Sequence, residues 1–86
     1  MYYLYILKSE FYSKTYVGIS SNLQKRIKEH NSGLSFFTKR YRPWKLIYCE
    51  QCLDRVEARK REEYFKTASG RKKINQIIIY SAVAQR

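Results

Sequence analysis

The chain has 86 residues, which suffices for one domain with one modest hydrophobic core and excludes a second domain. Its hydrophobic fraction of 44% is ordinary for a globular protein, and no apolar run approaches the roughly 20 residues that a membrane span needs. Eighteen Lys and Arg against seven Asp and Glu give a net charge of +11, which favours a polyanionic partner.

A membrane surface is a competing partner for so basic a protein. No segment, however, joins a basic face to a broad apolar face that contains Trp or Phe, as an interfacial helix would. We therefore expect nucleic acid as the partner, although a non-enzymatic RNA binder is compatible with the charge alone. The first ten residues, MYYLYILKSE, lack the basic region and cleavage site of a signal peptide, so a cytoplasmic protein is expected.

Two strands are predicted at the start of the chain. Residues 2–8 (YYLYILK) are apolar or aromatic on both faces, as in a central strand that is covered on each side. Residues 15–19 (TYVGI) are β-branched and aromatic and follow a polar stretch, which predicts an antiparallel hairpin. A turn centred near residues 10–11 places Tyr5 and Tyr16 near each other across the two strands.

A helix and a third strand follow. Ser21 or Asn22 is a suitable N-cap for a helix over residues 23–31 (LQKRIKEHN), and Gly33 is a suitable stop at its C-terminal end. An irregular stretch, LSFFTKRYRP, then leads to a third predicted strand at residues 44–50 (WKLIYCE).

The rest of the chain is predicted to be helical. Asp54 and Glu57 resemble a capping box at the start of a second helix that continues to about Lys66. The Ser-Gly pair at residues 69–70 is expected to break this helix, and a basic turn at residues 71–73 then starts a last segment, in which isoleucines recur at helical spacing. The order ββαβαα predicts an α+β fold with a small, mainly antiparallel sheet, as a single domain over the whole chain.

Cys49 and Cys52 form a single C-x-x-C pair. A structural zinc site needs four ligands, and His30 is the only histidine. A redox pair would normally open a helix in a thioredoxin-like context, which this chain does not supply. We expect two reduced cysteines at the end of a strand.

The first predicted helix has a distinct inward face. At about 100° per residue, Leu23 and Ile27 define the inward stripe, His30 falls within it, and Arg26 lies on its flank. Glu29 is expected to point to solvent. On spacing alone, a structural role is the preferred interpretation, with a hydrogen-bonded, semi-buried histidine and an arginine whose stem packs on the core.

The second predicted helix separates its two adjacent carboxylates. Glu62 lies at the edge of the apolar face formed around Ala58 and Phe65, while Glu63 lies on the solvated side. A carboxylate at such an edge requires a cation or a metal ion, and an ion pair with Lys or Arg is the more common solution. Because the seven carboxylates are not clustered, a bound metal would be one ion held by one or two carboxylates and water, as Mg²⁺ usually is.

The segment FFTKRYRPW alternates aromatic residues with the cations Lys39, Arg40 and Arg42. We expect these three cations to bind phosphates, and exposed rings to be able to stack on unpaired bases. Tyr41 and Trp44 could equally well pack against the end of the third strand.

These motifs together resemble the GIY-YIG nuclease superfamily. The resemblance rests on YLYIL at residues 3–7, YVG at residues 16–18, Arg26, and Glu62 at the end of EARKRE. The most specific part is YVGISSNLQKRIKEHNSG, which is similar both to stand-alone bacterial members and to the branched-DNA nucleases of eukaryotes. The resemblance spans about residues 2–73 and implies a three-stranded antiparallel sheet flanked by helices.

The resemblance also implies roles for individual residues. Tyr5 matches the tyrosine that activates or orients water, and Tyr16 belongs to the second half of the motif. Gly18 matches a glycine that lets the backbone pass close to the site. His30 matches a histidine that assists proton transfer.

Arg26 matches the arginine that stabilises charge on the phosphoryl oxygens, and Glu62 matches the metal-binding glutamate. A divalent ion, Mg²⁺ or Mn²⁺, is the implied cofactor. A phenol with a pKa near 10 is a poor base, so Arg26 or the metal would have to lower the pKa of Tyr5.

The implied activity is metal-dependent hydrolysis of nucleic-acid phosphodiesters, with DNA favoured over RNA and branched or damaged DNA as the expected substrate. A protein partner that supplies targeting is also expected. The alternative is a nucleic-acid-binding module with weak or no catalysis, which would use the same residues only to hold phosphate.

Overall fold

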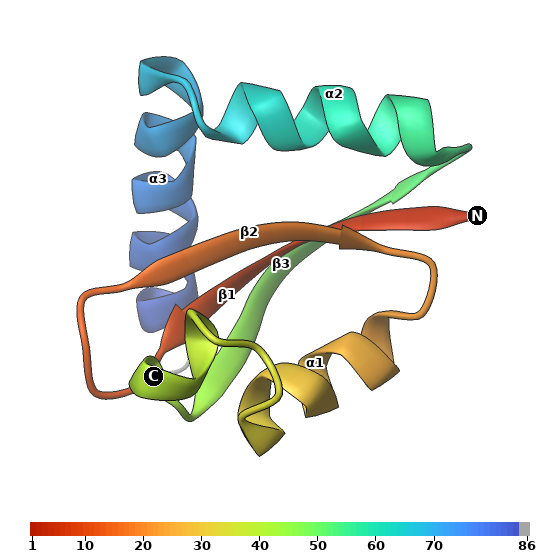
Figure 1. Cartoon of the computed structure of the whole chain (residues 1–86). Helices are drawn as coiled ribbons and strands as arrows, with labels where there is room; N and C mark the ends of the chain where they lie inside the picture. The colour runs from red at the N-terminus through yellow and green to blue at the C-terminus, as the bar shows by residue number, and fades with distance from the viewer. Residues whose placement is uncertain (85–86) are drawn as a thin grey trace.

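The computed structural model describes the backbone of residues 1–84 and the side chains of residues 1–80. Its elements, in chain order, are β1 (Tyr2–Ser9), β2 (Thr15–Ser20), α1 (Leu23–Ser32), the 3₁₀ helix η1 (Thr38–Tyr41), β3 (Trp44–Cys52), α2 (Arg55–Phe65) and α3 (Ala68–Ala84). The strands form one antiparallel sheet in the order β2-β1-β3. Figure 1 shows α2 and α3 on one side of the sheet and α1 on the other. The predicted α+β class is therefore confirmed, and no helix within residues 1–84 has the length and apolar character to cross a membrane.

The central strand β1 is buried on both faces. Leu4 and Ile6 pack in the core beneath α2 and α3, while Tyr5 and Leu7 belong to a second core on the side of α1. All four side chains are at most 1% exposed. Because successive side chains of a strand alternate between the faces, β1 supplies both cores at once. The continuous apolar run in the sequence is explained by this position.

The register of the hairpin differs from the expectation. Tyr5 pairs with Gly18, and Leu7 pairs with Tyr16, so the turn is centred one position later than residues 10–11. The partner of Tyr5 is therefore shifted by two residues. Because a shift of two preserves the side-chain face, Tyr5 and Tyr16 still share one face of the sheet, with ring centroids 6.3 Å apart.

Local caps and one bridging side chain fix α1. The Asn22 side chain accepts a hydrogen bond from the Lys25 backbone N–H at 3.2 Å, and Gly33 ends the helix with φ 89°. Asn31 then binds the backbone of Trp44 on both sides, accepting from its N–H at 2.6 Å and donating to its carbonyl at 3.1 Å. These bonds tie the end of α1 to the start of β3.

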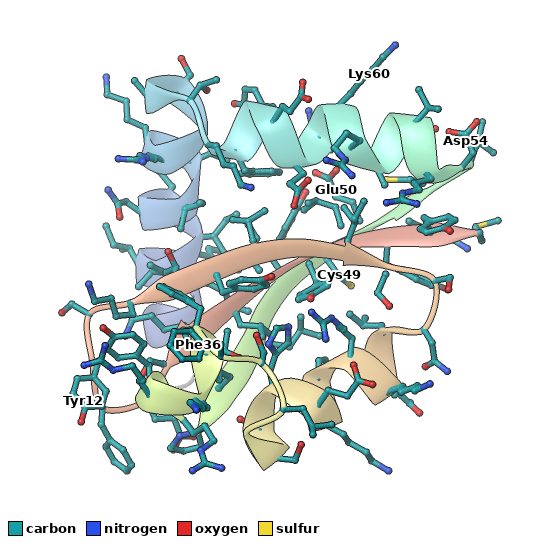
Figure 2. All side chains as sticks on the ribbon, viewed as in Figure 1. Tyr12, Phe36, Cys49, Glu50, Asp54 and Lys60 are labelled. Carbon is teal, nitrogen blue, oxygen red and sulfur yellow. The ribbon has the colours of Figure 1, made fainter. Side chains whose placement is uncertain are left out.

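The predicted capping box of α2 is present. Asp54 accepts from the Glu57 backbone N–H at 2.9 Å, and the Glu57 carboxylate accepts from the backbone N–H of Leu53 at 3.1 Å. Figure 2 shows Asp54 at the start of α2. The helix therefore begins where the sequence predicted.

A partly buried ion pair between α2 and β3 fixes the rotation of α2 about its own axis. Arg61 donates two hydrogen bonds of 2.8 Å to Glu50 of β3, and its guanidinium lies 4.9 Å from the ring centroid of Tyr64. Figure 2 shows Glu50 between α2 and the sheet. The hydrogen bonds from Arg61 hold the pKa of the Glu50 carboxyl below its usual value. Since Arg61 points to the sheet, the next residue, Glu62, is also held in a defined direction.

The predicted helix break at residues 69–70 is wrong. Both residues lie in the first turn of α3, so the basic residues 71–73 continue that helix and do not start it. The chain turns before them, where the Thr67 hydroxyl accepts from the Gly70 backbone N–H at 3.1 Å. A Cβ on Gly70 would lie within 2.8 Å of the Phe65 carbonyl carbon. Glycine is needed there for the close approach of α3 to the end of α2, and it does not break a helix.

Candidate active site

A buried cluster of aromatic and polar side chains lies between the sheet and α1. The Tyr5 hydroxyl and His30 Nε2 are 2.9 Å apart, and His30 Nδ1 is 2.8 Å from the hydroxyl of Thr38 in η1. The ring of Tyr16 lies against that of His30, with centroids 4.8 Å apart. His30 is fully buried, as the helical spacing predicted, and both of its ring nitrogens are hydrogen bonded.

Tyr5 and His30 are both neutral at neutral pH. Burial, aided by the neighbouring Tyr16, raises the pKa of Tyr5 to about 12, and the opposing effect of Arg26 does not outweigh it. Burial and the charge of Arg26 lower the pKa of His30 to about 4. In the free protein, therefore, Arg26 does not make Tyr5 a stronger acid than an ordinary phenol. Tyr5 is a hydrogen-bonding hydroxyl and not a phenolate.

Gly18 allows Tyr5 to lie across β2. A Cβ at this position would be 2.5 Å from the Tyr5 hydroxyl oxygen, 2.7 Å from Tyr5 Cζ and 2.9 Å from Cε2 of Tyr16. These distances are well inside van der Waals contact, and the atoms belong to packed rings. Glycine is therefore required by the tyrosine that crosses it, which is a more specific reason than backbone freedom alone.

Replacing Gly18 by alanine is expected to lower the free energy of unfolding by about 1–3 kcal/mol, because the added methyl group overpacks the buried ring. Urea unfolding measures the change. The double variant Gly18→Ala/Tyr5→Phe should cost less than the sum of the two single variants, since removing the hydroxyl relieves the closest contact. Strictly additive losses would contradict this account of Gly18.

Arg26 lies at the rim of the cluster. Burial raises the pKa of Tyr5, and the Arg26 guanidinium offsets part of that rise, so its charge acts on the hydroxyl; the Arg26 side chain is 35% exposed. Arg26 Nη1 is 2.9 Å from the carboxylate of Glu29, three residues later on α1. Glu29, which was expected to point to solvent, is 28% exposed, and this ion pair directs its side chain along the helix towards Arg26. Arg26 is thus held in place while part of it stays open to an anion.

Glu62 approaches the site from α2. Its side chain is 16% exposed, whereas Glu63 is exposed, in agreement with the helical phase read from the sequence. The nearest cations are Lys66 Nζ at 3.6 Å and Arg59 Nε at 3.7 Å. Both distances exceed that of a good hydrogen bond, so the predicted ion pairing exists but is loose.

Glu62 fits the donor set of a single hard cation. No group of three or more His, Cys, Asp and Glu side chains that could enclose a metal occurs in the part of the chain that the structure describes. Mg²⁺ commonly binds through one or two carboxylates and completes its shell with water and substrate phosphate. The loose contacts of Glu62 leave its oxygens free to take that role.

An open cleft of about 840 Å³ extends from the buried cluster to Glu62, with walls from β2, α2 and α3. We call it the β2–α3 cleft. Tyr16 and Glu62 both line it, as do the cations Lys8, Lys66 and Arg71. Its lining residues run from the end of α2 along α3 to the turn between β1 and β2.

The three cations expected to bind phosphate lie elsewhere. Lys39 and Arg40 are exposed on η1, and the guanidinium of Arg42 packs against Gly33, whose added Cβ would be 2.6 Å from Arg42 Nη1. Among the described residues that line the β2–α3 cleft, none of the three is present. Their role in phosphate binding stays a prediction.

The aromatic residues of the same segment divide into two groups. Trp44 is 4% exposed, with the Tyr41 ring edge-on to it at 6.5 Å, so both pack at the start of β3. Phe36 and Phe37 are 80% and 50% exposed, and Figure 2 shows Phe36 next to η1. Only the latter two rings are free to contact a partner.

Sequence reasoning missed Thr38, Lys8, Lys66 and Arg71. Thr38 is fully buried and bonded to His30, but it lies in an irregular segment where no periodicity marks a buried residue. The three cations are unremarkable members of a chain with eighteen Lys and Arg. Only the packing of α3 beside β2 brings them together.

The cysteines take no part in this site. Cys49 is exposed and Cys52 is buried, and both are free thiols on β3. Residues three apart on a strand point to opposite faces, so this pair is not arranged as a ligand pair.

The model of the GIY-YIG catalytic domain family matches residues 1–75. The chain is 41% identical over 78 residues to the UPF0213 protein CPE1444 of Clostridium perfringens, covering 90% of this chain and 83% of that protein. It is 37% identical over 73 residues to the UPF0213 protein YazA of Bacillus subtilis, covering 84% and 73%. The solution NMR structure of the UPF0213 protein BH0048 from Bacillus halodurans aligns with a TM-score of 0.53 at 29% identity, over 91% of this chain and 83% of that one. The chain therefore belongs to the GIY-YIG family.

Proposed function

We propose that this protein is an endonuclease that hydrolyses nucleic-acid phosphodiesters with one divalent metal ion, and that DNA is its substrate. The observation that supports the proposal is that Tyr16, which packs on His30 in the buried cluster, lines the same open cleft as Glu62 of α2. The Tyr5 hydroxyl of β1, bonded to His30, is affected electrostatically by both Arg26 of α1 and Glu62 of α2. A fixed cation, a polar hydroxyl and a carboxylate are the groups that water attack on a phosphodiester needs.

Tyr5 orients the attacking water in this proposal. Its pKa of about 12 makes it a poor base at neutral pH, so its contribution is the direction of its hydroxyl. In this proposal His30 carries its proton on Nδ1, so that Nδ1–H donates to the Thr38 hydroxyl and Nε2 accepts from the Tyr5 hydroxyl. The Tyr5 oxygen can then accept a hydrogen bond from the attacking water and orient it.

Arg26 and Glu62 act on the phosphate. The exposed part of the Arg26 guanidinium binds the non-bridging oxygens, on which negative charge increases in the transition state. Glu62 would hold the divalent ion, Mg²⁺ or Mn²⁺, which supplies Lewis-acid polarisation of the phosphate when it is bound.

Removal of divalent metal tests the proposal. The purified protein is incubated with end-labelled single-stranded, duplex and branched DNA, and with RNA of the same sequence, in Mg²⁺, Mn²⁺ or EDTA. We expect cleavage of DNA with either metal and none in EDTA. Binding without cleavage of any substrate would favour the alternative, a nucleic-acid-binding module, while equal cleavage in EDTA would exclude a metal-dependent mechanism.

A further inference from the structure

We infer that the β2–α3 cleft is the binding site of one nucleic-acid strand, whose phosphates are held by Lys66 and Arg71 and, at the far end, by Lys8. This inference rests on the proposed function and adds the path by which a strand reaches the site. The cleft begins at the candidate site itself, since Tyr16 and Glu62 are part of its wall.

The charge of the cleft suits a polyanion. Three of its described lining residues are cations, and Glu62 is the single carboxylate among them. The Lys66 side chain is 62% exposed and only loosely paired with Glu62, at 3.6 Å. Arg71 makes no side-chain hydrogen bond or salt bridge within residues 1–80, so its guanidinium is available to a phosphate.

Lys8, at the far end of the cleft, also stabilises the turn between β1 and β2. Its ammonium donates hydrogen bonds of 2.7 Å to the backbone carbonyls of Ser9 and Tyr12, which fixes its charge beside the β1–β2 turn. Figure 2 shows Tyr12 at this end of the molecule. Because its removal would also disturb the turn, Lys8 is unsuited to a binding test, and Lys66 and Arg71 are the informative positions.

The remaining lining of the cleft suits the sugars and bases of the same strand. Tyr16 and Phe37 stand beside each other on the wall with ring centroids 6.2 Å apart, and Phe37 is half exposed. Val17, Ile74 and Ile78 add apolar surface. Cations that follow a backbone next to exposed rings are the common arrangement in strand-binding proteins.

The test compares two double variants that lose the same charge. Lys66→Ala/Arg71→Ala removes two cations of the cleft, and Lys60→Ala/Lys72→Ala removes two cations of α2 and α3 that do not line it. Figure 2 shows Lys60 pointing away from the sheet on the outer side of α2. Melting curves establish that both variants fold.

Fluorescence anisotropy in EDTA, over a series of salt concentrations, measures binding to a labelled strand alone and in a duplex, as DNA and as RNA. For the cleft variant we expect roughly tenfold weaker binding at low salt. The slope of log K against log salt should become shallower by about 0.7 per lost contact on a single strand, or about 0.9 on a duplex. The control variant should lose clearly less.

Losses confined to the single strand would assign the cleft to an unpaired strand, and equal losses on both forms would assign it to one strand of a duplex. A control variant that loses as much as the cleft variant would overturn the inference, because net charge would then be the cause. Binding is measured without metal, so the two proposals can fail separately. Cleft-dependent binding without cleavage in Mg²⁺ would refute the nuclease alone, and cleavage with unchanged binding by the cleft variant would refute the cleft alone.

Discussion

Replacing Glu62 by glutamine is expected to slow metal-dependent cleavage by about a hundredfold or more. Glutamine keeps the size of the side chain and removes the charge that would hold the cation. The Glu63→Gln variant is the matched control, because Glu63 is the next residue of α2, carries the same charge and is exposed. Its cleavage rate should stay within about twofold of the wild type.

Single-turnover cleavage of the same labelled DNA measures both rates, and a titration with Mn²⁺ shows whether the apparent metal affinity has fallen. The Glu62 variant should remain folded. The ion pairs that it loses are with Arg59 and Lys66, whose side chains are 54% and 62% exposed, and such exposed pairs contribute little to stability. If Glu62→Gln and Glu63→Gln cleave at the same rate, the assignment of Glu62 to the metal is wrong.

The second large effect concerns stability in acid. His30 has a pKa of about 4 in the folded protein, because burial and then the charge of Arg26 disfavour its protonation, against an ordinary value of 6.5. Below pH 6.5 His30 becomes protonated in the unfolded chain, whereas in the folded protein it stays neutral until the pH approaches 4. The stability due to neutral His30 is therefore complete above pH 6.5 and is lost as the pH falls towards 4. Between pH 7 and pH 4 the free energy of unfolding should fall by about 3 kcal/mol from this group.

Urea unfolding at a series of pH values measures this loss, and the His30→Gln variant separates it from other titrations. Glutamine has no charge to gain, while the other titratable groups are the same in both proteins. We expect a lower stability of the variant at pH 7 and a clearly shallower dependence on pH between 6.5 and 4. Parallel curves for the two proteins would show that His30 is not the group that destabilises the fold in acid.

The sequence by itself determined the element types and which face of each element is buried. The reason is that caps and hydrophobic periodicity are local: Asn22 and Asp54 cap their helices through bonds within three residues, and β1 is apolar on both faces because both are covered. The helical phase alone placed His30 inside and Glu62, rather than Glu63, at the edge of the core. The roles of these residues came from resemblance to the family.

Local patterns did fail where glycine was concerned. The local pattern predicted a helix break at Gly70, but glycine is needed there because the end of α2 leaves no room for a Cβ. For Gly18 the family resemblance implied a close approach of the backbone to the site, and the structure shows that the ring of Tyr5 is what excludes a side chain there. In both places the constraint comes from a segment that the local pattern does not contain.

Only the tertiary structure decided which side chains meet. The bond from His30 to Thr38, the pairing of Tyr5 with Gly18 and the β2–α3 cleft all join segments whose separation in the sequence carries no pattern. They depend on long-range packing, since the Glu50–Arg61 bonds fix α2 on the sheet and the turn after α2 then directs α3 across the sheet. The sequence pattern of an element determines which of its faces is buried. The packing of all the elements against one another then determines which cations, rings and carboxylates lie in the same site.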